Sequence, residues 1–223
     1  MELAGKTVLI VGADDIGLGI AKRFSRAGAS VSVTDAREPP GLIACDALVV
    51  NTLGPPDVAP LEQQSDGAFS AALERVTVAA GLMCAALTGM RDRGGGRFIL
   101  IGHRYGETVS EGIGPYHAAA CALVGLMRSA AVEWGKWGVT TNLLLPFAST
   151  AELRAAREKR PKIVDMLTGQ VALKRAGDPV EDIGGAALYL ASADAAFVNG
   201  QVLYADGGQH IAAPVLNPSK YAT

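Results

Sequence analysis

Tyr116 and His103 are the side chains of this 223-residue sequence whose types and spacing best suit acid/base chemistry. His103 follows the apolar run Arg97–Ile101, which predicts a buried strand. Tyr116 lies thirteen residues after His103, at the expected start of a long apolar helix. An imidazole can exchange a proton near neutral pH, and a phenol can donate one in a general-acid step. The end of this strand is therefore a candidate active site.

The helix that begins at Tyr116 supplies no cation beside the phenol. The residue one helical turn later is Ala120, and residues four apart on a helix are neighbours. A phenol without a nearby positive charge keeps a pKa of about 10, so its phenolate is scarce at neutral pH. We therefore expect little acid/base power from Tyr116.

The N-terminal segment has the pattern of a dinucleotide-binding unit. Thr7–Val11 predicts a buried strand and Ile16–Ala27 an amphipathic helix. Ser30–Thr34 predicts a second strand, which ends at Asp35. A glycine, Gly12, directly follows the first strand, where a pyrophosphate would approach the backbone.

Two acids, Asp14 and Asp15, stand in the loop between that strand and the helix. A carboxylate at a helix start satisfies free backbone N–H groups and the helix dipole. The same carboxylate would repel a bound pyrophosphate. We therefore expect an acid to occupy the place of the phosphate.

The remaining patterns describe a single α/β domain over residues 1–223, with a parallel sheet of the Rossmann-like, doubly wound kind. The core is expected to be aliphatic, because 49% of the residues are hydrophobic but only 5% are aromatic. The further elements expected are strands at Asp46–Asn51, Val139–Leu145 and Gly200–Ala205, and helices at Asp66–Met90, Tyr116–Gly135, Glu152–Lys162 and Pro179–Ala191.

Bulk properties exclude several classes of partner. A formal net charge of −2 argues against nucleic acid, and no apolar run reaches the length of a membrane span. The N-terminus lacks the pattern of a signal peptide, and no ligand spacing indicates a metal. We expect a cytoplasmic protein whose three cysteines, Cys45, Cys84 and Cys121, are buried free thiols.

The C-terminal third resembles the short-chain dehydrogenase/reductase family. The resemblance rests on RAGDPVEDIG from Arg175, ALYLAS from Ala187 and NGQVLYADGG from Asn199, which are similar to the family's PEDIA, LASD and GQVLxVDGG ending. It implies a Rossmann-like fold, NAD(P) as cofactor, and the oxidation of an alcohol or reduction of a ketone by a tyrosine, lysine, serine and asparagine.

Only one of the family's four catalytic positions is retained. The tyrosine corresponds to Tyr116, the lysine to Ala120 and the serine to His103, while the asparagine falls at or near Thr77. His103 could bind a carbonyl or act as a base, or it could be a pocket residue without a role. The resemblance thus implies a vestigial catalytic site.

The family's TGxxxGxG loop is altered as well. The preferred alignment puts Asp15 at the motif's middle glycine and Gly17 at its third, with the loop one residue short. An alternative alignment makes Gly17 the second glycine of the motif and Gly19 the third. Asp35 matches the acid that binds the adenosine ribose, and it equally suits an exposed strand end. The family's third strand and its helix have no counterpart between about residues 39 and 46. This implies a sheet shortened by one edge strand and no cofactor in this chain.

The pattern of loss suggests a non-catalytic subunit. We expect it to assemble, as a heterotetramer, with an active NAD-dependent paralogue that oxidises a hydroxyacyl-CoA-type alcohol. Two alternatives stay open: an active NAD(P)-dependent oxidoreductase that uses Tyr116 and His103, and a small-ligand sensor on the same fold. A cluster of cations between Arg154 and Lys162 could meet a CoA phosphate or form a solvated helix face.

Overall fold

The computed structural model describes residues 2–35, 42–104 and 110–211. Within these residues six parallel strands form one sheet in the order β2-β1-β3-β4-β5-β6. The strands are β1 (Thr7–Val11), β2 (Ser30–Thr34), β3 (Ala47–Val50), β4 (Gly96–Ile101), β5 (Val139–Pro146) and β6 (Val202–Ala205). The expected doubly wound α/β fold is confirmed, with β2 at the edge.

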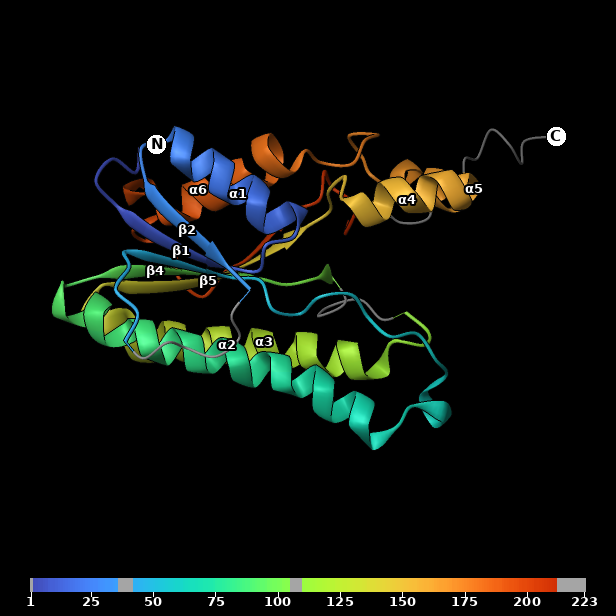
Figure 1. Cartoon of the computed structure of the whole chain (residues 1–223), viewed down its shortest axis with the longest axis horizontal. Helices are drawn as coiled ribbons and strands as arrows, with labels where there is room; N and C mark the ends of the chain where they lie inside the picture. Colours follow the sequence, from blue (N-terminus) through green and yellow to red (C-terminus); the bar gives the residue numbers. More distant parts are fainter. Residues whose placement is uncertain (1, 36–41, 105–109, 212–223) are drawn as a thin grey trace.

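Helices cover both faces of the sheet, which is why its central strands are mostly apolar. β5 is the exception, with Thr140, Thr141 and Asn142 buried in its first half. The helices are α1 (Asp15–Arg26), α2 (Asp66–Asp92), α3 (Gly114–Trp134), α4 (Ala151–Lys159), α5 (Pro161–Gly169) and α6 (Gly184–Ala191). α1 and α6 pack on one face, and α2 and α3 lie side by side on the other (Figure 1). Each helical layer forms a separate hydrophobic cluster with the sheet.

The shortened connection between β2 and β3 leaves β2 as a half-covered edge strand. Its valines, Val31 and Val33, pack toward the cluster on the α1 side, while Ser30 and Ser32 are exposed. This alternation of apolar and polar residues is what an edge strand with one covered face requires.

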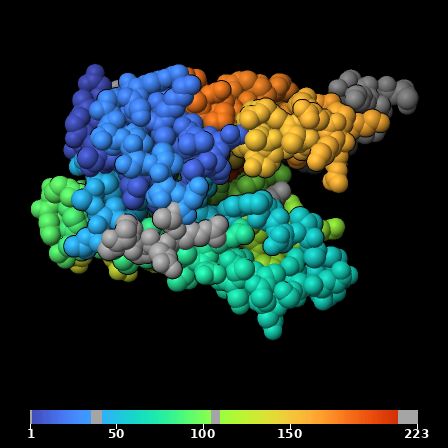
Figure 2. All heavy atoms as spheres, viewed as in Figure 1, coloured from blue at the N-terminus to red at the C-terminus, as the bar shows by residue number. Residues whose placement is uncertain are grey.

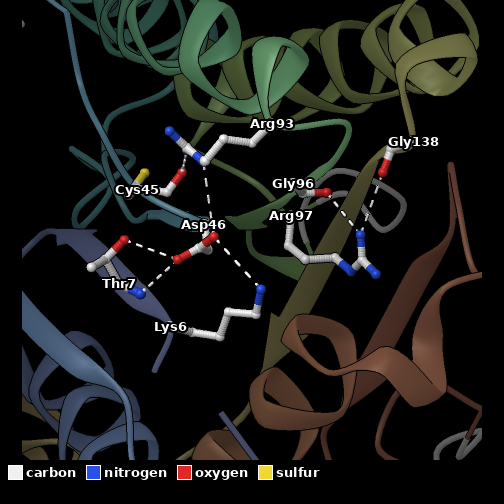
Figure 3. A network of polar contacts seen from close by, with 8 residues as sticks. All are labelled: Lys6, Thr7, Cys45, Asp46, Arg93, Gly96, Arg97 and Gly138. Carbon is white, nitrogen blue, oxygen red and sulfur yellow. Dashed lines mark hydrogen bonds and ion pairs between the residues drawn. The ribbon is translucent and has the colours of Figure 1, made fainter. Parts of the chain in front are cut away.

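Asp46 fastens the start of β3 to the start of β1 (Figure 3). Its Oδ2 accepts hydrogen bonds from the Thr7 backbone N–H at 2.8 Å and from the Thr7 hydroxyl at 3.0 Å. Its Oδ1 lies 3.7 Å from Lys6 Nζ and 3.9 Å from Arg93 Nε. Burial alone would raise the pKa of the Asp46 carboxyl, but these hydrogen bonds and charges bring it below its ordinary value.

The charged segment expected as one helix is two, because Pro161 ends α4 and opens α5. We call α4 and α5 (Ala151–Gly169) the lid. The lid stands out from the body of the molecule beyond the end of the sheet (Figures 1 and 2). The segment expected as a helix from Pro179 is a wide π turn, Pro179–Ile183, that leads into α6.

α2 is apolar over a longer stretch than we expect from the sequence. Of the helices in the described ranges, it is the one long and apolar enough to cross a membrane by length and composition alone. Leu82, Met83 and Met90 are fully buried, so this helix packs on the sheet as a core helix does. Only 22% of its apolar stretch is buried, however. Much of this apolar stretch is therefore left uncovered by the residues that the structure describes.

The cysteines differ from expectation. Cys45 is buried, and burial raises the pKa of its thiol to about 11. Cys84 on α2 and Cys121 on α3 are exposed, so the expectation of three buried thiols is wrong. Both helices bury only one face, and these two residues lie on the other.

Candidate functional site

The N-terminus of α1 is closed by a side chain of the chain itself. Asp14 is the cap residue, and its Oδ1 accepts hydrogen bonds from Gly17 N–H at 2.9 Å and from Asn51 Nδ2 at 2.8 Å. A helix start presents free N–H donors that attract an anion, usually a phosphate in this fold. Here the Asp14 carboxylate takes that role.

Asp15 connects the same loop to the lid. Its Oδ2 accepts a hydrogen bond from the Ala151 backbone N–H at the start of α4, and it lies 3.2 Å from Arg154 Nη2. Asp35, at the end of β2, accepts from Ala13 N–H at 2.7 Å. Three carboxylates thus accept hydrogen bonds from backbone N–H groups around the loop between β1 and α1. Asp14 comes from that loop, Asp15 from the first turn of α1 and Asp35 from the residue after β2.

The glycines of the loop permit close packing of backbones. A Cβ at Gly17 would overlap the Gly12 carbonyl oxygen, and one at Gly19 would overlap Pro179. Both Gly17 and Gly19 lie inside α1. This geometry favours the alignment in which Gly17 is the third glycine of the motif and Gly19 lies on the packed face of the helix.

Tyr116 and His103 come together at the expected place. Their rings meet edge to face, with centroids 6.0 Å apart. Tyr116 is 5% exposed and belongs to the hydrophobic cluster of α2 and α3, and Ala120 is buried beside it. Burial lowers the pKa of the His103 imidazole to about 4, with the charge of Arg104 acting in the same direction. His103 is therefore neutral at physiological pH.

Arg75, which the sequence reasoning missed, replaces Thr77 as the α2 residue beside Tyr116. Thr77 is exposed, and its hydroxyl donates to the Leu73 carbonyl within α2. Arg75 is half-buried; its Nη1 donates to the carbonyl oxygens of Leu53 and, at 3.2 Å, Pro55.

Helical spacing could have identified Arg75. It lies three residues after Ala72 and four before Ala79, both of which are buried, so it shares their inward face. Arg75 and Tyr116 line a common cavity of about 20 Å³, room for about one water. A residue with a positive charge thus shares a cavity with Tyr116, although it lies on a different helix from the family's lysine.

The fold and this site define a class: a Rossmann-like α/β domain of the dehydrogenase type, with carboxylates on the loop between β1 and α1. Residues 42–210 match the family model described as enoyl-(acyl carrier protein) reductase. The chain belongs to the short-chain dehydrogenase/reductase family.

Similar proteins agree with this assignment. Gluconate 5-dehydrogenase of Gluconobacter oxydans (strain 621H) is 29% identical over 245 residues, covering 93% of this chain and 95% of that protein. The crystal structure of a gluconate 5-dehydrogenase from Burkholderia cenocepacia J2315 in complex with NADP and tartrate superposes with a TM-score of 0.83. It is 27% identical, with 95% of this chain and 98% of that chain covered.

The coverage differs between relatives. Acetoacetyl-CoA reductase of Rhizobium meliloti (strain 1021) is 35% identical over 126 residues, which span 56% of this chain and only 51% of that enzyme. The identity to this enzyme is therefore confined to about half of each chain. In the residues that the structure describes, no group of three or more His, Cys, Asp or Glu side chains is arranged to hold a metal ion.

Proposed function

We propose that this chain is a non-catalytic subunit of a hetero-oligomeric short-chain dehydrogenase. It assembles with an active paralogue that holds NAD and oxidises a hydroxyacyl-CoA-type alcohol, in the cytoplasm and as a heterotetramer. The observation that carries the proposal is the position of Asp14 and Asp15, whose carboxylates accept N–H donors at the start of α1 and of α4. In its pattern of loss the chain resembles the inactive, shortened subunit of 2-(hydroxybenzyl)succinyl-CoA dehydrogenase in anaerobic toluene degradation.

Electrostatics supports the absence of a nucleotide from this chain. Two unit charges of like sign 4 Å apart repel by about 1 kcal/mol in water and by about 4 kcal/mol near a protein surface. A pyrophosphate at the α1 N-terminus would meet both Asp14 and Asp15. It would also lose the Gly17 N–H, which Asp14 already engages.

The acid/base group supports the same proposal. Ala120 supplies no charge to Tyr116, and His103 is held neutral by burial. Removing members of a catalytic group that acts as a unit costs orders of magnitude in rate. The substitution of three positions out of four leaves no complete proton pathway of the family's kind.

The outer face of α2 and α3 supports an assembly role. A Cβ built at Gly81 on α2 or at Gly125 on α3 would meet nothing within 4 Å. Leu73, Cys84 and Cys121 are exposed on the same two helices. A surface of small and apolar residues allows another helix pair to approach closely, and burying it would be favourable.

An active NAD(P)-dependent oxidoreductase is the second candidate, and the comparisons taken alone favour it. Homologues of the chain are oxidoreductases, one of them solved with NADP. In this chain the neutral His103 would hydrogen-bond the carbonyl oxygen, and Tyr116 would hold the proton. Arg75, which lines the same cavity as Tyr116, would supply the positive charge that Ala120 lacks.

Titration of the purified chain with NADH and NADPH by calorimetry separates the two candidates. The first predicts no saturation up to about 1 mM; micromolar binding by the lone chain would exclude it and support the second. A double variant, Asp14→Asn with Asp15→Asn, keeps side-chain acceptors at the helix start but removes both charges. Weak binding gained by this variant would show that the carboxylates exclude the nucleotide.

Co-expression with the product of an adjacent dehydrogenase gene tests the assembly. The proposal predicts a mixed oligomer on size exclusion, whose activity survives Tyr116→Phe in this chain. A loss of about a hundredfold on that substitution would place the chemistry in this chain. A chain that remains homomeric in the presence of its sibling would contradict the partner role.

A further inference from the structure

The lid and the loop after it enclose a pocket of about 270 Å³ with a strongly basic wall. Four cations and two hydroxyls line it: Arg154, Arg157, Lys174, Arg175, Ser149 and Thr168. No acid is among the residues that line it. Its arginines and lysine come from α4 and from the loop after α5.

Carboxylates outside the pocket fix the arginines in place. Arg157 Nη1 lies 3.0 Å from Asp165, and Arg175 Nη2 lies 2.9 Å from Asp182. Arg154 is held at 3.2 Å by Asp15. A guanidinium carries five N–H donors in a rigid plane, so one ion pair orients it and leaves other donors available.

Lys174 adds a charge with no carboxylate partner among the described residues. Its Nζ donates to the Gly169 carbonyl oxygen at 2.9 Å, an uncharged acceptor. In the described ranges it is also the one non-glycine residue with a left-handed backbone, at φ 58°. That conformation costs about 1 kcal/mol or more for such a residue. Residues kept under strain in this way are concentrated at ligand-binding positions.

We propose that this pocket binds a phosphate group, free or as part of an organic phosphate. Cations outnumber their paired acids by one, so a net positive charge remains at the pocket. Arginine donors match phosphate oxygens two at a time, and the Ser149 hydroxyl can donate to a third. The Thr168 hydroxyl already donates to the Val164 carbonyl oxygen at 2.8 Å, so it adds a polar wall and no free donor. The volume suits a pyrophosphate or a small phosphate ester and is below that of a typical drug-sized site.

The inference does not depend on the proposed function. The pocket is separate from the N-terminus of α1, where Asp14 already satisfies the helix start. An active oxidoreductase and a non-catalytic subunit could each carry an anion site on the lid. Asp15 does not line this pocket. Its ion pair with Arg154 nevertheless connects the N-terminus of α1 to the lid.

Calorimetric titration with pyrophosphate in a chloride buffer tests the site. We expect saturable one-to-one binding, weakened about tenfold by Lys174→Gln and by Arg157→Gln, as the loss of one charged hydrogen bond predicts. Matched controls are Lys159→Gln and Arg160→Gln, which remove the same charges from exposed lid positions that do not line the pocket. They should change the dissociation constant less than about twofold.

Two outcomes would overturn the proposal: no saturation by pyrophosphate, or equal weakening by the pocket variants and their controls. Arg157→Gln also breaks the ion pair with Asp165, so thermal unfolding is used to check that this variant folds. If it does not fold, the result for Lys174→Gln alone tests the proposal. Parallel titrations with inorganic phosphate and with adenosine 3′,5′-bisphosphate separate a site for the free ion from one for an organic phosphate. Citrate, a carboxylate anion, should bind more weakly than either.

Discussion

A single carboxylate changes what the first turn of α1 can do. In a dinucleotide site the free N–H groups of that turn stay unsatisfied until a phosphate arrives. Asp14 satisfies one of them permanently and also holds the Asn51 amide at the end of β3. The same carboxylate that would weaken cofactor binding therefore stabilises the folded chain without a cofactor.

Replacing Asp14 by alanine should lower the free energy of unfolding by about 1–2 kcal/mol, the usual cost of losing a helix cap. Asp14→Asn is the control, because its amide oxygen can accept the same hydrogen bonds and should cost less than about 0.5 kcal/mol. Urea unfolding followed by circular dichroism measures both. An unchanged stability in the alanine variant would mean that the carboxylate does not stabilise the loop.

His103 should make the protein sensitive to mild acid. The folded state holds its pKa at about 4, whereas an unfolded histidine titrates near 6.5. Between these values the unfolded state binds more protons, so the free energy of unfolding falls as the pH drops from about 6.5 to about 4. His103→Gln should remove about 2 kcal/mol of that loss between pH 7 and pH 4.5. Parallel pH profiles for the two proteins would refute the burial of this imidazole.

Individual residues were harder to predict than their neighbourhood. The approach of Tyr116 and His103 followed from their spacing of thirteen residues, which is the spacing of the corresponding positions in the family that the sequence resembles. The α2 residue beside Tyr116 was not predicted correctly, because an alignment error of two positions rotates a helical side chain by about 200°. Thr77 therefore faces solvent and Arg75 faces the site. The side-chain hydrogen bonds of Asp15 to the lid were equally hidden, since they span a separation of 136 residues.

At the scale of elements, the sheet is continuous without the missing strand, whose place in the family's sheet is at the edge. β3 pairs directly with β1 along four residues, Ala47 to Val50. Asp46 anchors that pairing through Thr7, and Arg93 also donates to the Cys45 carbonyl. The edge strand of the larger fold can therefore be absent without exposing the central strands.

A double-mutant cycle on Asp46→Ala and Thr7→Val measures this anchor. We expect a coupling of about 1 kcal/mol in the free energy of unfolding, because the cycle isolates the hydrogen bond from the Thr7 hydroxyl to Asp46, while the bond from the Thr7 backbone N–H is unaffected by Thr7→Val. Lys6→Gln, at an exposed ion pair, should cost less than about 0.5 kcal/mol. Since the pKa of Asp46 is lowered by folding, its contribution should be lost as the pH falls below about 4. Additive effects at neutral pH would count against the anchor.

Elements with strong periodicity were predictable, and those set by tertiary contacts were less so. Each predicted strand lies within two residues of its observed bounds, because buried parallel strands are continuous apolar runs. The lid was misjudged as one helix although Pro161 marks the break. The turn before α6 is wide because its backbone hydrogen bonds span five residues, from Ile183 N–H to the Asp178 carbonyl and from Gly184 N–H to the Pro179 carbonyl. Such a local contact has no signal in hydrophobic spacing.

At the scale of the whole molecule, the two faces of the sheet differ in what covers them. α1 is tied to the turn that leads into α6 (Pro179–Ile183) through ion pairs such as Arg23 with Glu181, at 2.6 Å. α2 and α3 form a layer whose outer side carries glycines with open space above them. The first face is completed within the chain, and the second is suited to a partner. The proposed assembly follows from this asymmetry.

Gly125→Arg probes that surface without disturbing the chain. Because nothing lies within 4 Å of the added Cβ, the variant should fold with a stability within about 1 kcal/mol of wild type. If α3 contacts a partner there, the bulky cation should abolish the mixed oligomer on size exclusion. Gly169→Arg on the lid, where a Cβ also meets nothing within 4 Å, should leave assembly intact. Equal assembly by both variants would place the partner on another surface.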